Sequence, residues 1–264
     1  MPLNPITEDD KRRFSVEELA NRMRDIISEY WLEYIIKFHS AEPEIIARYQ
    51  ETFDREKITS ILSCAEFDKK CDGEKKQILH YCFNFFVQNI MYYLDLTTSR
   101  NFGTETLVDL FWQKKVNQDN IVRSRISFEN FMQIVHLLKC GELLKGKSKR
   151  KAFAKFIKDN KRDVGLLQVA LEHAAIHDTD YRTGIVHKTS EFTSEILRFQ
   201  FDTSEASNSQ LALHNLNKNL WKYILEIAES GKVTGFTCTN QKIMKDSQIM
   251  ADEFFKNKKV EIDK

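Results

Sequence analysis

The scarcity of chain-breaking residues is the feature that most limits what this chain can fold into. Its 264 residues include only eight glycines and three prolines, and the prolines stand at positions 2, 5 and 43. A β-sandwich or a dinucleotide-binding sheet needs glycine-rich turns at short intervals, whereas long helices do not. The content of 42% hydrophobic and 30% charged residues is that of a globular protein with a buried core. We therefore predict an all-α fold, a multi-helix bundle.

Hydrophobic periodicity locates the helices in the first part of the chain. Ser15 and Glu18 have the spacing of a capping box, which predicts that a helix begins there. Apolar residues follow at helical spacing from Leu19 to Phe38. The other helices predicted by periodicity cover residues 43–53, 55–67, 74–95, 104–117 and 127–140. Residues 74–95 are apolar on all sides, which is typical of a central helix, and Gly141 is placed as a helix stop.

The strongest charge asymmetry lies in residues 145–162, which hold nine basic residues and one acid, Asp159. This change of composition predicts a boundary between an N-terminal helical region, 1–144, and a C-terminal helical region, 145–264. The two regions could also form one continuous domain. Apolar residues interleave with the lysines, so half of the run should form an amphipathic helix with its lysines outward.

Such a basic face has three interpretations. It can be a solvated surface, a surface for an acidic protein partner, or a contact for the RNA backbone through salt-sensitive interactions. Because the net charge is only +1, any RNA binding must depend on this local cluster. The candidate RNA-binding residues are all basic and comprise Lys147, Lys149, Arg150, Lys151, Lys155 and, further along the chain, Lys188.

Arg182 and His187 stand five residues apart in a helix-forming stretch. A guanidinium can hold phosphate oxygens in a bidentate fork, and a neutral imidazole can accept a hydroxyl proton. Together they suffice for metal-free RNA cleavage, in which the substrate's own 2′-hydroxyl attacks the adjacent phosphorus. Thr183 and Glu191 lie four residues before and after the histidine, where either could fix its tautomer. The alternative is a surface or structural Arg/His pair.

The segment from Tyr181 to Glu191 resembles the Arg-x4–6-His signature of the HEPN superfamily (higher eukaryotes and prokaryotes nucleotide-binding). The resemblance is to members that read Tyr-Arg-Thr, then His-Lys and Thr-Ser. It implies a HEPN-like helical bundle in the C-terminal half and a metal-independent endoribonuclease of toxin–antitoxin or defence systems. In that family two copies often dimerise to join their motifs, and an antitoxin-type protein is a further implied partner.

Carried over to this chain, the resemblance gives Arg182 the phosphate and His187 the role of base or acid, with Tyr181 in support. Thr183 departs from the pattern, because active members frequently have Asn, Asp or His directly after the arginine. A noncatalytic helical module that binds RNA, a nucleotide or another protein therefore remains the competing interpretation.

His173 and His177 form a second candidate site, since histidines four residues apart on a helix can chelate a metal. No glutamate follows His173, so the metalloprotease pattern is absent. The simpler interpretation is that both histidines cap or pack around the motif turn. We therefore expect no metal and no cofactor.

The remaining composition predicts a cytoplasmic location. The five cysteines include no C-x-x-C pair, which indicates reduced and mostly buried thiols in a cytosolic protein. The N-terminal residues carry charges where a signal peptide would be apolar, and no apolar run reaches the ~18 residues of a membrane span.

Overall fold

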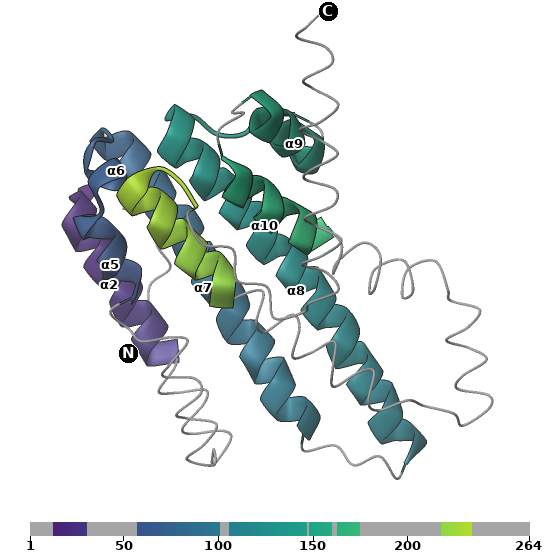
Figure 1. Ribbon diagram of the computed structural model, residues 1–264. Coiled ribbons are helices and arrows are strands. Elements are labelled where there is room, and N and C mark those ends of the chain that lie inside the picture. The colour runs from purple at the N-terminus through teal and green to yellow at the C-terminus, as the bar shows by residue number, and fades with distance from the viewer. Residues whose placement is uncertain are drawn as a thin grey trace, which may run out of the picture. The chain divides into compact units, whose positions relative to one another are not determined.

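In the computed structural model, the residues described are 13–30, 57–100, 106–146, 148–159, 163–174 and 218–233. The chain divides into two compact units, 1–145 with 224–231 and 146–223 with 232–264. All regular structure within the described residues is helical, which confirms the predicted all-α, multi-helix fold (Figure 1).

The first unit is built around two long helices that run side by side in opposite directions, α7 and α8 (Figure 1). Among the described residues its helices, in chain order, are α2 (Val16–Tyr30), α5 (Lys57–Ser60), η2 (Ile61–Ser63), α6 (Ala65–Asp68), α7 (Asp72–Arg100) and α8 (Leu107–Cys140), and residues 224–230 are also helical. Both α2 and α5 pack on α7. The fully buried apolar side chains of this unit include Leu19, Met23, Ile61, Ile78, Leu79, Cys82, Phe131 and Val135.

The predicted capping box at the start of α2 is confirmed. The Ser15 backbone N–H donates to the Glu18 carboxylate at 2.7 Å, and the Glu18 N–H donates to the Ser15 hydroxyl at 3.1 Å. These two bonds satisfy backbone donors that the first turn of a helix leaves without an internal acceptor.

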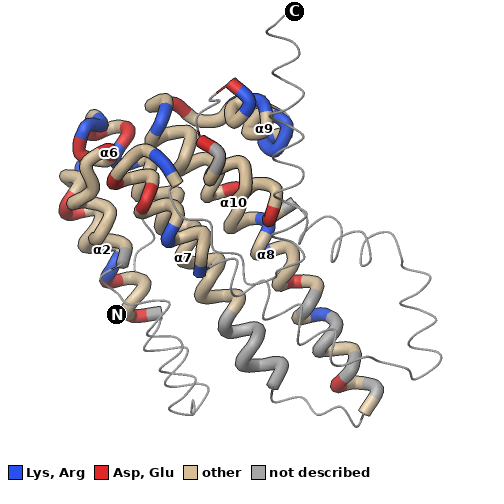
Figure 2. Tube along the Cα trace, viewed as in Figure 1, with Lys and Arg blue, Asp and Glu red and all other residues tan. Residues whose placement is uncertain are grey.

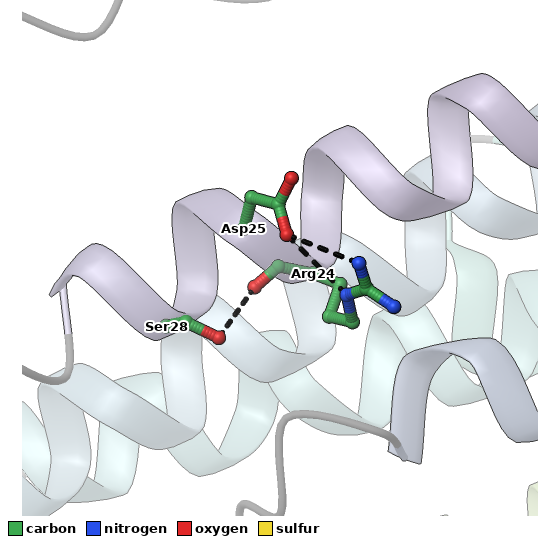
Figure 3. Close-up of polar contacts among 3 residues, drawn as sticks. All are labelled: Arg24, Asp25 and Ser28. Carbon is green, nitrogen blue, oxygen red and sulfur yellow. Dashed lines mark hydrogen bonds and ion pairs between the residues drawn. The ribbon is translucent and has the colours of Figure 1, made fainter.

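The outer face of α2 carries local polar contacts (Figure 3). The Arg24 guanidinium lies 3.3 Å from the Asp25 carboxylate, and the Ser28 hydroxyl donates to the Arg24 carbonyl at 2.9 Å. An exposed ion pair of this kind contributes at most about 1 kcal/mol. The position of α2 therefore depends mainly on its inner face, where Leu19 and Met23 are completely buried.

The single helix predicted for residues 55–67 is wrong in the described part, 57–67. There the chain forms α5, then the 3-10 turn η2, then an extended Cys64 with ψ of 135° before α6 begins. The Ser63 hydroxyl donates to the Ser60 carbonyl at 3.0 Å, and the Cys64 N–H donates to the Ile61 carbonyl at 3.1 Å. Serine side chains that bind nearby backbone groups compete with helical hydrogen bonds, which is consistent with the break.

The prediction of separate helices over 104–117 and 127–140 is also wrong, because α8 continues through both. Residues 118–126, between the two predicted helices, lack the usual helical periodicity of apolar side chains. Asn120 and Ser124 are completely buried, whereas Val122 and Ile126 are exposed. This part of α8 thus buries polar residues beside apolar Ile121 and exposes apolar residues, which departs from the usual amphipathic pattern.

Both ends of α8 are capped by the chain itself. Asp109 N–H donates to the Thr106 hydroxyl at 3.1 Å, and Thr106 N–H donates to the Asp109 carboxylate at 3.3 Å, a second capping box. At the other end Gly141 adopts the left-handed conformation, with φ of 71°, and its N–H donates to the Leu137 carbonyl. The predicted helix stop at Gly141 is therefore confirmed.

The second unit contains α9 (Lys149–Asp159) and α10 (Val164–Ala174). Asp163 caps α10, because its carboxylate accepts the Leu166 N–H at 3.0 Å. Gly165 lies against the backbone of Val233, in the same unit, and a Cβ at this position would collide with the Val233 carbonyl and side chain. The glycine is required by this close approach.

Gly165→Ala should lower the free energy of unfolding by about 1–3 kcal/mol, the typical cost of forcing an atom into a packed site. Gly73→Ala in α7 is the matched control, because no atom lies within 4 Å of its added Cβ. The control should instead gain about 0.5–1 kcal/mol from helix propensity. Urea unfolding followed by circular dichroism measures the free energy of unfolding of both variants. Equal values for Gly165→Ala and the unaltered protein would contradict the close approach.

The capping box of α2 predicts a pH dependence. The Ser15 backbone N–H, aided by its hydroxyl, holds the pKa of Glu18 below its usual value near 4.5. A carboxylate with a lowered pKa in the folded state stabilises that state above the usual pKa and loses this contribution as the pH falls through the folded value. Glu18→Gln should therefore lose less stability than the unaltered protein on acidification.

Unfolding midpoints measured over the acid range test this. Glu17→Gln is the control, since Glu17 is the neighbour of Glu18 and takes part in neither of the two capping hydrogen bonds. If the unfolding midpoints of Glu18→Gln and the unaltered protein fall in parallel with pH, the ionised Glu18 carboxylate does not stabilise the helix cap.

Candidate nucleic-acid interface

The basic run between the two predicted regions forms a helix, α9, from Lys149 to Asp159. Ser148 precedes it, and the Ser148 hydroxyl accepts the Lys151 N–H at 3.4 Å while its carbonyl accepts the Ala152 N–H at 3.1 Å. No acidic residue stands in the first turn. The positive side chains are therefore added to the positive end of the helix dipole, which favours anions and opposes cations.

The inner face of α9 is apolar. Phe153, Phe156 and Ile157 are buried, and the two phenylalanine rings stack with centroids 5.9 Å apart and planes 29° apart. Helix α9 packs against α10 in the second unit. The prediction of an amphipathic helix over part of the basic run is confirmed.

The outer face of α9 is basic, and Lys and Arg residues gather along the helix (Figure 2). Lys151, Lys155 and Lys158 are exposed and stand at i, i+4 and i+7, which places them on one side of the helix. Like charges four residues apart on a helix repel one another. A multivalent anion in contact with the face would relieve the repulsion.

The other predicted RNA contacts differ in exposure. Lys149 and Arg150 are half-buried at the start of α9. Lys147 and Lys188 lie outside the described residues. The exposed cations of α9 are therefore those on its outer side, with Lys149 and Arg150 at the margin.

The Arg/His motif falls outside the described part of the chain. Helix α10 ends at Ala174, and residues 175–217, which include Tyr181, Arg182, Thr183, His187 and Glu191, follow it. In the sequence the motif follows α9 and α10. Its catalytic assignment stays a prediction.

The weaker metal alternative is partly described. His173 lies in the last turn of α10 with only 1% of its surface exposed, and His177 lies outside the described residues. Within the described ranges, no group of three or more His, Cys, Asp or Glu side chains is positioned to hold a metal ion.

The thiols differ from one another in burial. Burial raises the pKa of the Cys64 thiol to about 11, and the nearby Glu229 carboxylate adds to the shift. Burial also raises the pKa of Cys82, so both thiols stay protonated at neutral pH. Cys71 and Cys140 are exposed, and Cys238 lies outside the described residues, so the prediction of mostly buried cysteines stays untested.

Sequence reasoning missed the polar interior of α7 and α8. Buried polar side chains with at least one atom that makes no hydrogen bond belong to Asn89, Asn120, Ser124, Ser127 and Asn130. Between 118 and 126 the sequence has only Ile121, Val122 and Ile126 as apolar residues, which resembles a helix break.

No protein-family model, curated protein or solved structure matches this chain. Of the helices in the described ranges, none combines the length and the apolar character that crossing a membrane would require.

Proposed function

We propose that this protein is a metal-independent endoribonuclease of HEPN type, in which Arg182 and His187 act on RNA held by the basic face of α9. The observation that carries the proposal is the outward row of Lys151, Lys155 and Lys158 above a buried aromatic face. A phosphate backbone would pair with such a row. The motif supplies the chemistry, and it follows α9 and α10 along the chain.

The proposed reaction uses two side chains. The His187 imidazole accepts the proton of the 2′-hydroxyl as O2′ forms a bond to phosphorus, and the bond from phosphorus to O5′ breaks. The leaving O5′ takes up a proton, so the products carry a 2′,3′-cyclic phosphate and a 5′-hydroxyl. The Arg182 fork stabilises the charge that develops on the phosphate oxygens. Glu191 would orient the imidazole, with Tyr181 and Thr183 in supporting positions.

The resemblance to toxin–antitoxin and defence nucleases adds three parts to this proposal. The active form would join the motifs of two copies, an antitoxin-type protein would restrain it, and the enzyme would act in the cytoplasm. None of these parts is needed for the chemistry of a single Arg/His pair.

A second function is favoured by Thr183, which stands where active members frequently carry Asn, Asp or His. A chain that keeps the basic face and has lost a productive motif would bind RNA or a nucleotide without cutting it. The same face would also suit an acidic protein partner.

His187→Ala should abolish RNA cleavage, because the 2′-hydroxyl then lacks its proton acceptor. Arg182→Lys should reduce cleavage strongly, because an ammonium keeps the charge but loses the bidentate fork. Cleavage by the unaltered protein should persist in EDTA and should stop at any nucleotide whose 2′-hydroxyl is replaced by hydrogen. Gel analysis of fragments and mass spectrometry of their ends measure these outcomes.

The helical circular-dichroism signal of both variants serves as the folding control. Intact RNA with the unaltered protein, together with salt-sensitive binding, would favour the noncatalytic module. Activity lost in EDTA and recovered with a divalent ion would overturn the metal-independent mechanism.

The double substitution Lys151→Glu with Lys155→Glu should weaken RNA binding and lower its salt dependence. The slope of log K against log salt concentration should fall by about 0.7 for each phosphate of single-stranded RNA that the protein no longer neutralises. Lys69→Glu with Lys70→Glu is the matched control, since it changes net charge equally on the first unit. If both double variants weaken binding equally, the effect is one of net charge and α9 is not the interface.

A further inference from the structure

The N-terminal half of α8 carries a straight line of solvent-facing side chains. Its six positions are spaced alternately four and three residues apart and are Val108, Trp112, Lys115, Asp119, Val122 and Ile126, here called the α8 seam. The four apolar members are 62%, 44%, 57% and 38% exposed in chain order. The seam extends over about 27 Å at the rise of an α-helix. Exposed apolar side chains grouped at both ends of such a line, with a pair of opposite charges between them, are a candidate interaction surface.

The spacing of the seam points to a helix as its partner. Two seam positions in every seven residues is the narrow pattern of a coiled coil, whereas a helix packed on a globular core shows a broader stripe. The seam does not extend to Gln133, seven residues after Ile126, because that side chain is buried. Its side-chain carbonyl accepts the Leu144 N–H at 2.9 Å.

The order of residues along the seam is complementary to itself when reversed. If a second α8 runs in the opposite direction, Val108 lies opposite Ile126, Trp112 opposite Val122 and Lys115 opposite Asp119. A twofold axis generates each of these pairs twice. A second α8 running in the same direction would instead place Lys115 against Lys115 and Asp119 against Asp119, which like charges oppose.

We propose that the α8 seam is the interface of a homodimer in which two α8 helices pack antiparallel about a twofold axis. Within one chain the Lys115 ammonium lies 2.6 Å from the Asp119 carboxylate and 5.7 Å from the centroid of the Trp112 ring. The dimer places the same two charges of a second copy beside this pair, so four alternating charges occupy the centre between two apolar ends. A polar group in an apolar seam fixes register and orientation. The interface is independent of RNA cleavage.

Sedimentation equilibrium of the full chain across the micromolar range measures the proposed association. The unaltered protein should be dimeric, and Trp112→Ala or Val122→Glu should raise the dimer dissociation constant at least about tenfold. Met91→Glu is the matched control, because it places the same charge on an exposed apolar residue of α7, outside the seam, and should leave the mass unchanged. A monomer at all concentrations overturns the proposal, including the case in which another segment or another protein covers the seam.

A charge exchange tests the register directly. Lys115→Asp leaves two acids in the seam and Asp119→Lys leaves two lysines, so each variant alone should be shifted toward monomer. An equimolar mixture should recover dimers, because acids of one chain then face lysines of the other. Each helix has the same internal repulsion alone and in the mixture, so recovery reports a contact between chains.

The circular-dichroism spectra and melting temperatures of both variants verify that they fold. If each variant alone dimerises as tightly as the unaltered protein, or the mixture recovers no dimer, the seam is not the interface.

Discussion

The packing of α7 against α8 is the contact on which the first unit depends. One half of this pair is apolar, with Ile78 and Leu79 on α7 and Phe131 and Val135 on α8 completely buried. Burial of such side chains contributes roughly 1.5–3 kcal/mol each. Asn89 and Asn120 are buried as well, and Ile90, Tyr92, Val116 and Ile121 are buried near them in the chain. The described interior of the pair therefore mixes polar and apolar side chains in this part, and α2 and α6 add further buried apolar residues to the unit.

The buried polar side chains of this pair explain why the exposed apolar side chains of α8 point to an interaction surface. An inward Asn or Ser contributes little hydrophobic stabilisation and costs free energy unless its hydrogen bonds are made. Val122 and Ile126, which would ordinarily stabilise a helix from its inner face, are exposed. Burial of the α8 seam by a second copy would add apolar contacts on the exposed face of this part of α8, and the central charges would select one orientation.

In the second unit, one face of α9 packs against the protein and the opposite face carries positive charge. Phe153 and Phe156 hold the helix by burial, while the lysines four and three residues apart on the other face oppose one another. That arrangement of like charges is the observation from which we propose a polyanion partner. The proposed binding does not depend on whether Arg182 and His187 cut RNA, so binding and cleavage can be tested separately.

The sequence by itself determined the all-helical fold, the capping box of Ser15 and Glu18, the stop at Gly141 and the amphipathic α9, because each depends on groups a few residues apart. It also supplied the prediction that Arg182 and His187 act on RNA, and both residues lie outside the described part of the chain. Tertiary structure decided the continuity of α8 and the close approach at Gly165. In both cases the deciding partner, a buried neighbour or the carbonyl of Val233, comes from another segment of the chain, and periodicity contains no information about it.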